Sequence, residues 1–135
     1  MKDDIFVDEV RRAFDWVAAE HGCGYRGADT RLGISIVYRN EYVVLEVNAY
    51  KGEIEESICL RTPSGDALTG QCVYAYDVWR YFGAIDDARP LARWDATREE
   101  LRAQLTFDAG MLRKYCTPLL DGDVELFTIV LRSRR

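Results

Sequence analysis

Residues 31–61 read RLGISIVYRNEYVVLEVNAYKGEIEESICLR, and three segments of this stretch alternate apolar with polar or small side chains. A period of two predicts β-strands with one buried face. Asn40-Glu41 and Lys51-Gly52 separate the three segments, and residues of these types favour tight turns. The stretch therefore predicts a three-stranded antiparallel meander with one packed face and one face in water.

The predicted strands present two different faces. The inward face is apolar except at Glu56, where we expect a β-bulge or a sheet edge. The inward apolar residues are Leu32, Ile34, Ile36, Tyr38, Val43, Leu45, Val47, Ala49, Ile54, Ile58 and Leu60. The outward face carries tyrosines, carboxylates and an amide, and its candidate partner-binding residues are Tyr42, Glu46, Asn48, Tyr50, Glu53 and Glu55.

A helical pattern precedes the meander. Apolar residues recur at three- and four-residue spacing over Asp4–Glu20, which predicts an amphipathic helix that ends before Gly22. Tyr25–Thr30 follows, and we expect a loop there because the segment is polar and contains glycine.

The chain after the meander predicts one more short strand and further helices. Gln71–Tyr76 fits a fourth short strand, and Asp77–Gly83 fits one or two helical turns that a glycine stops. Thr97 and Glu100 form a capping-box pattern at the start of a long helix. Thr117-Pro118 ends or kinks that helix.

The final segment has two interpretations. Asp123 as an N-cap and Arg132 near the end favour a short helix over residues 123–133. The β-branched run Thr128-Ile129-Val130 leaves a terminal strand open. Together the patterns predict a single α+β domain over residues 1–135. It combines a small antiparallel sheet of three to four strands with an N-terminal helix and C-terminal helices packed on one face.

Composition and charge narrow the classes of function. The 135 residues are 48% hydrophobic and 30% charged, which is typical of one globular domain. Acidic residues outnumber basic ones by 23 to 18, and a net charge of −5 disfavours nucleic acid as a partner. Met1-Lys2-Asp3-Asp4 is unlike a signal peptide, and no apolar run is long enough to cross a membrane. We therefore expect a cytoplasmic protein that binds no membrane.

The residues that carry chemistry in many enzymes are sparse. His21 is the single histidine, and its place at the end of the first predicted helix favours a structural role. The cysteines Cys23, Cys59, Cys72 and Cys116 match no metal-binding spacing, and we expect them to be reduced and buried. We expect no catalytic residue, metal or cofactor. An enzyme would have to use carboxylates, tyrosines or a Cys23–His21 pair.

One stretch resembles a known group of proteins. Residues 112–123, LRKYCTPLLDGD, look like the closing motif of small bacterial α+β proteins, and the order of predicted elements is similar to theirs. Many of these proteins are uncharacterised, and some serve as immunity proteins in polymorphic-toxin loci. The resemblance implies a non-enzymatic protein that neutralises a toxin by binding it, often through an acidic surface.

These observations favour a protein-binding domain whose outward sheet face contacts a protein partner, such as a basic toxin domain. Tyrosine supplies contact area in interfaces, and carboxylates attract a basic surface. Three alternatives stay open. The first is a structural or regulatory homo-oligomeric subunit, such as a homodimer built through a sheet edge or through the aromatic segment around Tyr74–Phe82. The others are a small-ligand-binding protein and an enzyme.

Overall fold

The predicted meander forms the middle of a five-stranded antiparallel sheet. The computed structural model describes residues 3–30, 33–50, 53–62, 64, 66, 68, 70–85, 89–93 and 95–134. The strands, in the order β1-β2-β3-β4-β5 across the sheet, are β1 (Gly24–Thr30), β2 (Gly33–Arg39), β3 (Val43–Tyr50), β4 (Glu53–Leu60) and β5 (Val73–Tyr74). The helices are α1 (Asp3–His21), α2 (Ala75–Tyr81), α3 (Arg98–Tyr115), α4 (Thr117–Leu120) and α5 (Val124–Ser133).

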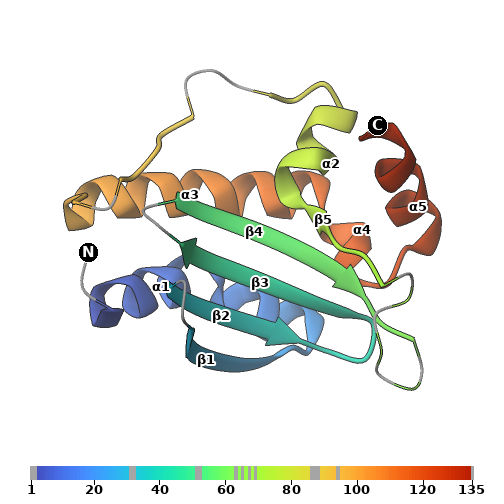
Figure 1. The fold of residues 1–135 in the computed structure, drawn as a ribbon, viewed down its shortest axis with the longest axis horizontal. Coiled ribbons are helices and arrows are strands. Elements are labelled where there is room, and N and C mark those ends of the chain that lie inside the picture. The colour runs from blue at the N-terminus through green and yellow to red at the C-terminus, as the bar shows by residue number, and fades with distance from the viewer. Residues whose placement is uncertain are drawn as a thin grey trace.

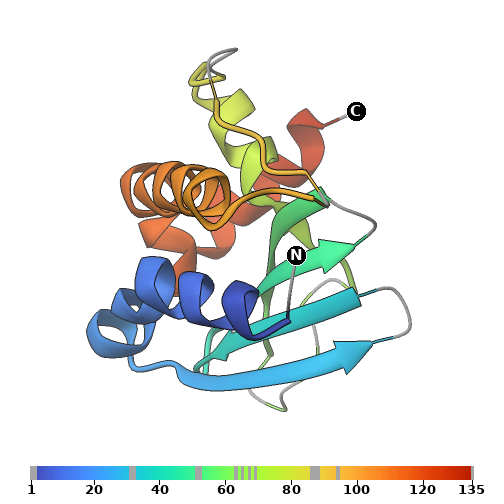
Figure 2. The ribbon, with the colours of Figure 1, turned by 90° about the vertical axis from the view of Figure 1, so that its left-hand side faces the viewer.

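The helices lie on one face of the sheet and at its β5 end. Figure 1 looks onto the sheet with α1 and α3 behind it, and the turned view in Figure 2 places these two helices on one side of the strands. α2 and α5 lie beside β5. No helix in the described part of the chain covers the opposite face, which we call the open face. The prediction of an α+β fold with helices on one face of an antiparallel sheet is confirmed.

Side chains of alternating strand residues form the core between sheet and helices. From β2 and β3 these include Ile36, Tyr38, Val43, Leu45 and Val47, all fully buried. The helices contribute Phe6, Val10, Phe14 and Val17 from α1, Leu101, Leu105 and Leu112 from α3, and Phe127 and Val130 from α5. The predicted inward faces of these strands are therefore confirmed, although Leu32 lies outside the described residues.

The expected helices are present, and the final segment is a helix rather than a strand. The fourth short strand is confined to Val73–Tyr74, because α2 begins at Ala75, inside the segment expected to be that strand. Thr97 Oγ1 accepts a hydrogen bond from the Glu100 amide at 3.2 Å, and the Glu100 carboxylate accepts one from the Thr97 amide at 3.1 Å. This capping box starts α3. Asp123 caps α5 by accepting from the Leu126 amide at 2.9 Å.

β1 replaces the loop that we expected over Tyr25–Thr30. Its residues pair continuously with β2, from Gly24 opposite Arg39 to Thr30 opposite Gly33. The pattern of residues shows little sign of a strand because β1 is the outer strand and is mostly polar. Tyr25 is one of its few core-facing groups, and its ring lies 5.7 Å from that of Tyr38.

Two of the cysteines form a disulfide, so the prediction that all four are reduced is wrong for Cys59 and Cys72. β4 pairs with β5 in the register Ser57 opposite Tyr74, and continuing that register brings Cys59 opposite Cys72. The bridge therefore crosses between neighbouring strands, and β5 was too short to show this pairing in the sequence. Cys23 and Cys116 are free and buried, as expected.

The first turn of the meander joins the sheet to two helices. The Asn40 side chain accepts from the amides of Tyr42 and Val43 at 2.8 and 3.0 Å. Its amide group donates to the carbonyls of His21 and Leu120, at the ends of α1 and α4. The Asn40-Glu41 turn is thus confirmed, whereas the expected turn at Lys51-Gly52 lies outside the described residues.

Glu9 links α1 to α3 through a cluster of arginines. Its carboxylate is 1% exposed and accepts from Arg12, Arg98 and Arg102 at 2.8–3.0 Å. The hydrogen bonds from these guanidinium groups, that of Arg102 above all, hold the pKa of Glu9 well below its usual range. This contribution to stability is present above the unfolded pKa and is lost as acid protonates the folded carboxylate.

Gly33 begins β2 in a conformation that only glycine adopts easily. Its φ is +151°, and a Cβ placed there would collide with the carbonyl oxygen of Ala49 on β3. We predict that Gly33→Ala lowers the free energy of unfolding by at least about 2 kcal/mol, because backbone atoms of β2 or β3 must move. Urea denaturation measures this change.

Gly110 provides the matched control for that substitution. It lies inside α3, and a Cβ added at this position would meet no other side chain or distant backbone within 4 Å among the described residues. Gly110→Ala should therefore raise the free energy of unfolding by about 0.5–1 kcal/mol, since alanine loses less backbone entropy in a helix. A Gly33→Ala variant as stable as the wild type would contradict the close approach of β2 and β3.

Candidate functional site

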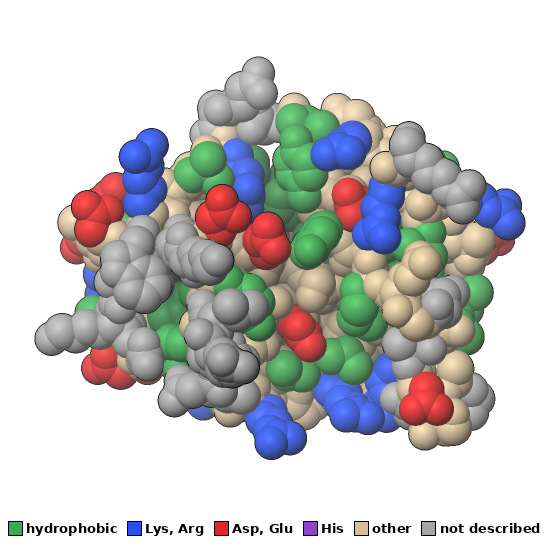
Figure 3. All heavy atoms as spheres, in the orientation of Figure 1, with side chains coloured by type: hydrophobic (Ala, Val, Ile, Leu, Met, Phe, Trp, Pro, Cys, Tyr) green, Lys and Arg blue, Asp and Glu red, His purple; other side chains and the backbone are tan. Residues whose placement is uncertain are grey.

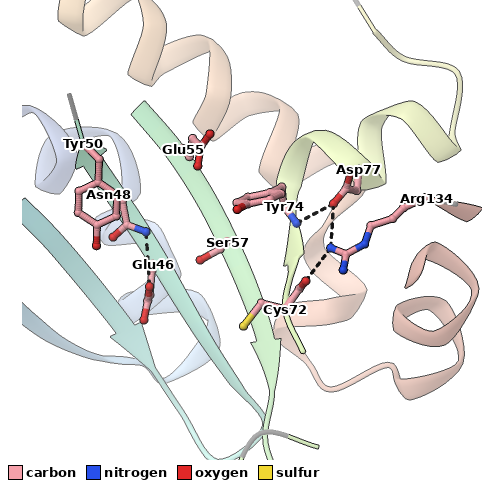
Figure 4. A pocket seen from close by; sticks show the side chains of 9 residues that line it. All are labelled: Glu46, Asn48, Tyr50, Glu55, Ser57, Cys72, Tyr74, Asp77 and Arg134. Carbon is pink, nitrogen blue, oxygen red and sulfur yellow. Dashed lines mark hydrogen bonds and ion pairs between the residues drawn. The ribbon is translucent and has the colours of Figure 1, made fainter. Parts of the chain in front are cut away.

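The open face of the sheet contains a groove between β3, β4 and the β5–α2 segment. It has a volume of about 640 Å³. Figure 3 looks onto this face and shows Asp and Glu side chains in its middle, with Lys or Arg side chains around them. The lining residues, drawn in Figure 4, are Glu46, Asn48, Tyr50, Glu55, Ser57, Cys72, Tyr74, Asp77 and Arg134.

The register of the strands brings these residues together. Glu46 of β3 pairs with Ser57 of β4, which pairs in turn with Tyr74 of β5. Asn48 pairs with Glu55, so the next row of the open face holds an amide and a carboxylate. Because directly opposite residues project to the same side of a sheet, the groove follows from strand alternation alone.

Four of the six residues expected to bind a partner line this groove: Glu46, Asn48, Tyr50 and Glu55. The other two lie apart from it. Tyr42 precedes β3 at the opposite end from Tyr50, and its side chain packs against Gly122. Glu53 faces Tyr50 across the β3–β4 pair but lines a neighbouring hollow.

Five lining residues were not among those predicted: Ser57, Cys72, Tyr74, Asp77 and Arg134. Tyr74 and Asp77 belong to a two-residue strand and a short helix, and Arg134 follows α5 near the end of the chain. Ser57 lies two residues after Glu55 in β4, so strand alternation puts both on the open face. The sequence carried no signal for Arg134, since its position depends on how α5 packs.

The two walls of the groove differ in charge. On the β5 side, Asp77 accepts from the Tyr74 amide at 3.0 Å and pairs with Arg134 at 3.4 Å. Arg134 also donates to the Cys72 carbonyl at 2.8 Å. On the β3–β4 side, the carboxylates of Glu46 and Glu55 form no ion pair with any residue that the structure describes. The groove therefore has a neutralised wall and an acidic wall.

Asn48 leaves a hydrogen-bond acceptor unused at the base of the acidic wall. The residue is 8% exposed, and its Nδ2 lies 3.4 Å from a Glu46 carboxylate oxygen. Its Oδ1 is buried without a hydrogen-bond partner in the described part of the chain. Since an unsatisfied buried acceptor costs about 1–3 kcal/mol, a donor that reached this atom would gain from it.

A second cluster of polar groups lies on the helix side of β4. Arg89 binds Asp108 of α3 with two hydrogen bonds of 2.8 Å, and Asp108 is fully buried. Gln104 donates to the same carboxylate at 3.3 Å and accepts from the Ala92 amide at 2.6 Å. Glu56, 3% exposed, completes the cluster.

Of the two expectations for Glu56, the β-bulge is wrong and the edge position is confirmed, because β5 pairs only with Ser57 and Ile58 in the described part of the sheet. Glu56 stays in register opposite Val47, although it lies beyond the two β4 residues that pair with β5. Burial, followed by the nearby negative charge of Asp108, raises the pKa of Glu56 well above its ordinary value of 4.5. The protonated form is thus favoured, and a proton shared with Asp108 explains how two carboxyls occupy one apolar site.

His21 and Cys23, the pair that an enzyme could use, each contact a neighbouring part of the fold. His21 Nδ1 lies 2.8 Å from Asp121 in the turn before α5. Cys23 Sγ lies 4.0 Å from the His21 carbonyl, and burial raises the pKa of this thiol to about 11. Cys23 is therefore protonated at neutral pH, unlike the thiolate of a cysteine nucleophile. Among the described residues no group of three or more His, Cys, Asp or Glu could hold a metal ion.

No protein-family model matches the chain, and neither a curated protein nor a solved structure was found to match it. Within the described ranges, no helix has the length and apolar character needed to cross a membrane.

The raised pKa of Glu56 predicts how stability depends on pH. The unfolded chain ionises this group above 4.5 while the folded chain retains its proton, so folding loses stability as pH rises toward the folded pKa. Each pKa unit is worth about 1.4 kcal/mol. We predict that Glu56→Gln removes this loss, so that the variant becomes more stable than the wild type as pH rises from about 4 to about 8.

Urea unfolding of both proteins across that pH range measures the effect. Glu55→Gln is the matched control, because Glu55 is the exposed neighbour on the opposite face of β4. Its stability should change with pH in parallel with the wild type. A constant difference between Glu56→Gln and the wild type at every pH would contradict the assignment of a protonated Glu56.

Proposed function

We propose that this chain is a non-catalytic protein-binding domain that holds a basic partner in the groove of the open face. The observation that carries the proposal is the pair of carboxylates, Glu46 and Glu55, that line the groove without ion pairs in the described part of the protein. A carboxylate of this kind has no bond to a neighbouring cation that must break before a partner docks. These two groups therefore favour a cationic side chain from a partner.

On the helix side of the molecule, unlike on the acidic wall of the groove, carboxylates pair with arginines. There Asp15 pairs with Arg11, Glu20 with Arg113, and Asp108 with Arg89. The chain thus has arginines enough to neutralise carboxylates where they support the fold. The carboxylates of the acidic wall therefore favour the binding of a partner rather than the stability of the fold.

Aromatic side chains add contact area to this charge. Tyr50 and Tyr74 both line the groove, and Tyr74 is 48% exposed. Tyrosine rings bind arginine and lysine through cation–π contact, and they lose little conformational entropy when a partner docks. The net charge of −5 attracts a basic partner over a longer range and speeds its association at low salt.

An immunity protein that neutralises a basic toxin domain is the most concrete form of this proposal. Such a protein needs tight binding and no catalytic group of its own. The alternative is a homo-oligomeric subunit. It is supported by β1, whose seven residues pair with β2 alone among the described strands and leave an edge that another chain can extend.

We predict that the double variant Glu46→Lys/Glu55→Lys binds its partner at least about tenfold more weakly, because it reverses the acidic wall of the groove. Affinity capture from the source cell's lysate at low and moderate salt supplies the partner, with the wild type as bait. Calorimetric titration of that partner then measures affinity, and an assay of its toxicity tests neutralisation.

Glu99→Lys/Glu125→Lys is the control for charge alone. Both residues are exposed in the first turns of α3 and α5, away from the groove, and the change in net charge is the same. This control should bind like the wild type. Equal binding by the groove variant would refute the groove as the contact surface, and a mass that rises with concentration for the bait alone would favour the homo-oligomer.

A further inference from the structure

A smaller pocket lies around the edge of β4 from the groove. Its volume is about 260 Å³, and it shares Glu55, Tyr74 and Asp77 with the groove. In the described part of the sheet β5 pairs only with Ser57 and Ile58, so β4 continues past its neighbour. The pocket is lined by this part of β4 and by Tyr76, Asp77 and Arg80 of α2. We call this the side pocket.

Two guanidinium groups line the side pocket. Arg89 uses Nε and Nη2 to bind Asp108, and Arg80 lies 5.0 Å from the centre of the Tyr76 ring. Arg80 forms no ion pair with a residue that the structure describes. Within this part of the chain, one of the two positive charges is therefore left without a countercharge.

Two of the acids around the side pocket, Asp77 and Asp108, are already bound to other groups. Asp77 is already bound by Arg134 and by the Tyr74 amide. Glu55 lines the side pocket as well, although its strand position belongs to the open-face row with Asn48. Asp108 is already bound by the two hydrogen bonds from Arg89.

Glu56 supplies a polar wall that does not repel an anion. It is 3% exposed, and its Oε1 is buried without a hydrogen-bond partner among the described residues. Its raised pKa favours the neutral carboxyl, which does not repel an anion while its proton is shared with Asp108. A buried polar atom in a pocket that two arginines also line favours a polar ligand.

We propose that the side pocket binds a small, flat organic carboxylate. The carboxylate would lie between Arg80 and Arg89, and the body of the ligand would lie against the rings of Tyr74 and Tyr76. Guanidinium groups bind carboxylates through paired hydrogen bonds, and tyrosine rings stack on flat ligands. A volume of 260 Å³ corresponds to roughly nine water molecules, which fits a ligand of this size and is too small for a nucleotide.

Titration of the full chain with benzoate tests the proposal. The indole N–H resonance of Trp79 reports binding, because the Trp79 ring lies 5.4 Å from the Arg89 guanidinium. It can be assigned with a Trp79→Phe variant. We predict a saturable shift with a Kd on the order of 1 mM or tighter. Benzamide, which has nearly the same shape and no charge, should cause no saturable shift.

Three variants separate a specific site from a general effect of charge. Arg80→Gln should weaken benzoate binding at least about tenfold, and Arg80→Lys should retain part of the affinity. Arg93→Gln is the matched control, because Arg93 is exposed and lines the neighbouring hollow instead. Arg89 is left unchanged, since its removal would strand the buried charge of Asp108.

Each outcome bears on the proposal. Saturable binding of benzoate that Arg80→Gln loses and Arg93→Gln retains supports the side pocket as a carboxylate site. Equal binding of benzamide, unchanged affinity in Arg80→Gln, or no saturation at about 10 mM benzoate would overturn it. The carboxylate site does not depend on a partner in the groove, so it can fail while protein binding stands.

Discussion

The register between β3 and β4 is the constraint on which the rest of the structure depends. It runs without interruption from Val43 opposite Leu60 to Tyr50 opposite Glu53. A slip of one residue would turn Glu46 toward the helices and Val47 toward water, because strand side chains alternate with a period of two. The core, the groove and the place of Glu56 therefore all follow from a single pairing, and the burial of Val43, Leu45 and Val47 is what fixes it.

Two buried glutamates show how the same side chain serves opposite purposes. Glu9 is surrounded by arginines and stays ionised, so it holds α1 against α3 through charge. Glu56 shares its site with Asp108 and Arg89, so burial and repulsion favour its neutral form. The difference lies in the number of cations within reach. Helix packing therefore gains from Glu9, whereas Glu56 costs stability and keeps a neutral carboxyl next to Arg89.

The local sequence pattern predicted the structural features that depend on residues close together in the chain. The faces of β3, the capping box of Thr97 and the helical end of the chain were all visible in this way, as was the acidic wall of the groove. What depends on packing between distant segments was not visible. β1 lies at the margin of the sheet and is polar, so its sequence does not alternate like that of the inner strands. The Cys59–Cys72 bridge depends on the pairing of β4 with β5, which is only two residues long. The second wall of the groove comes from β5, α2 and Arg134, which no period in the sequence brings together.

The β5 segment ties the groove to the side pocket. Tyr74 and Asp77 line both, and Asp77 holds Tyr74 by its amide while it binds Arg134 from the far end of the chain. The Cys59–Cys72 disulfide anchors the same segment to β4 two residues earlier. A strand of two residues has too few ladder hydrogen bonds to hold its own position, so these side-chain and covalent links set the position of Tyr74. Any ligand that shifts Tyr74 in one site must therefore change the shape of the other, and by linkage the effect is reciprocal.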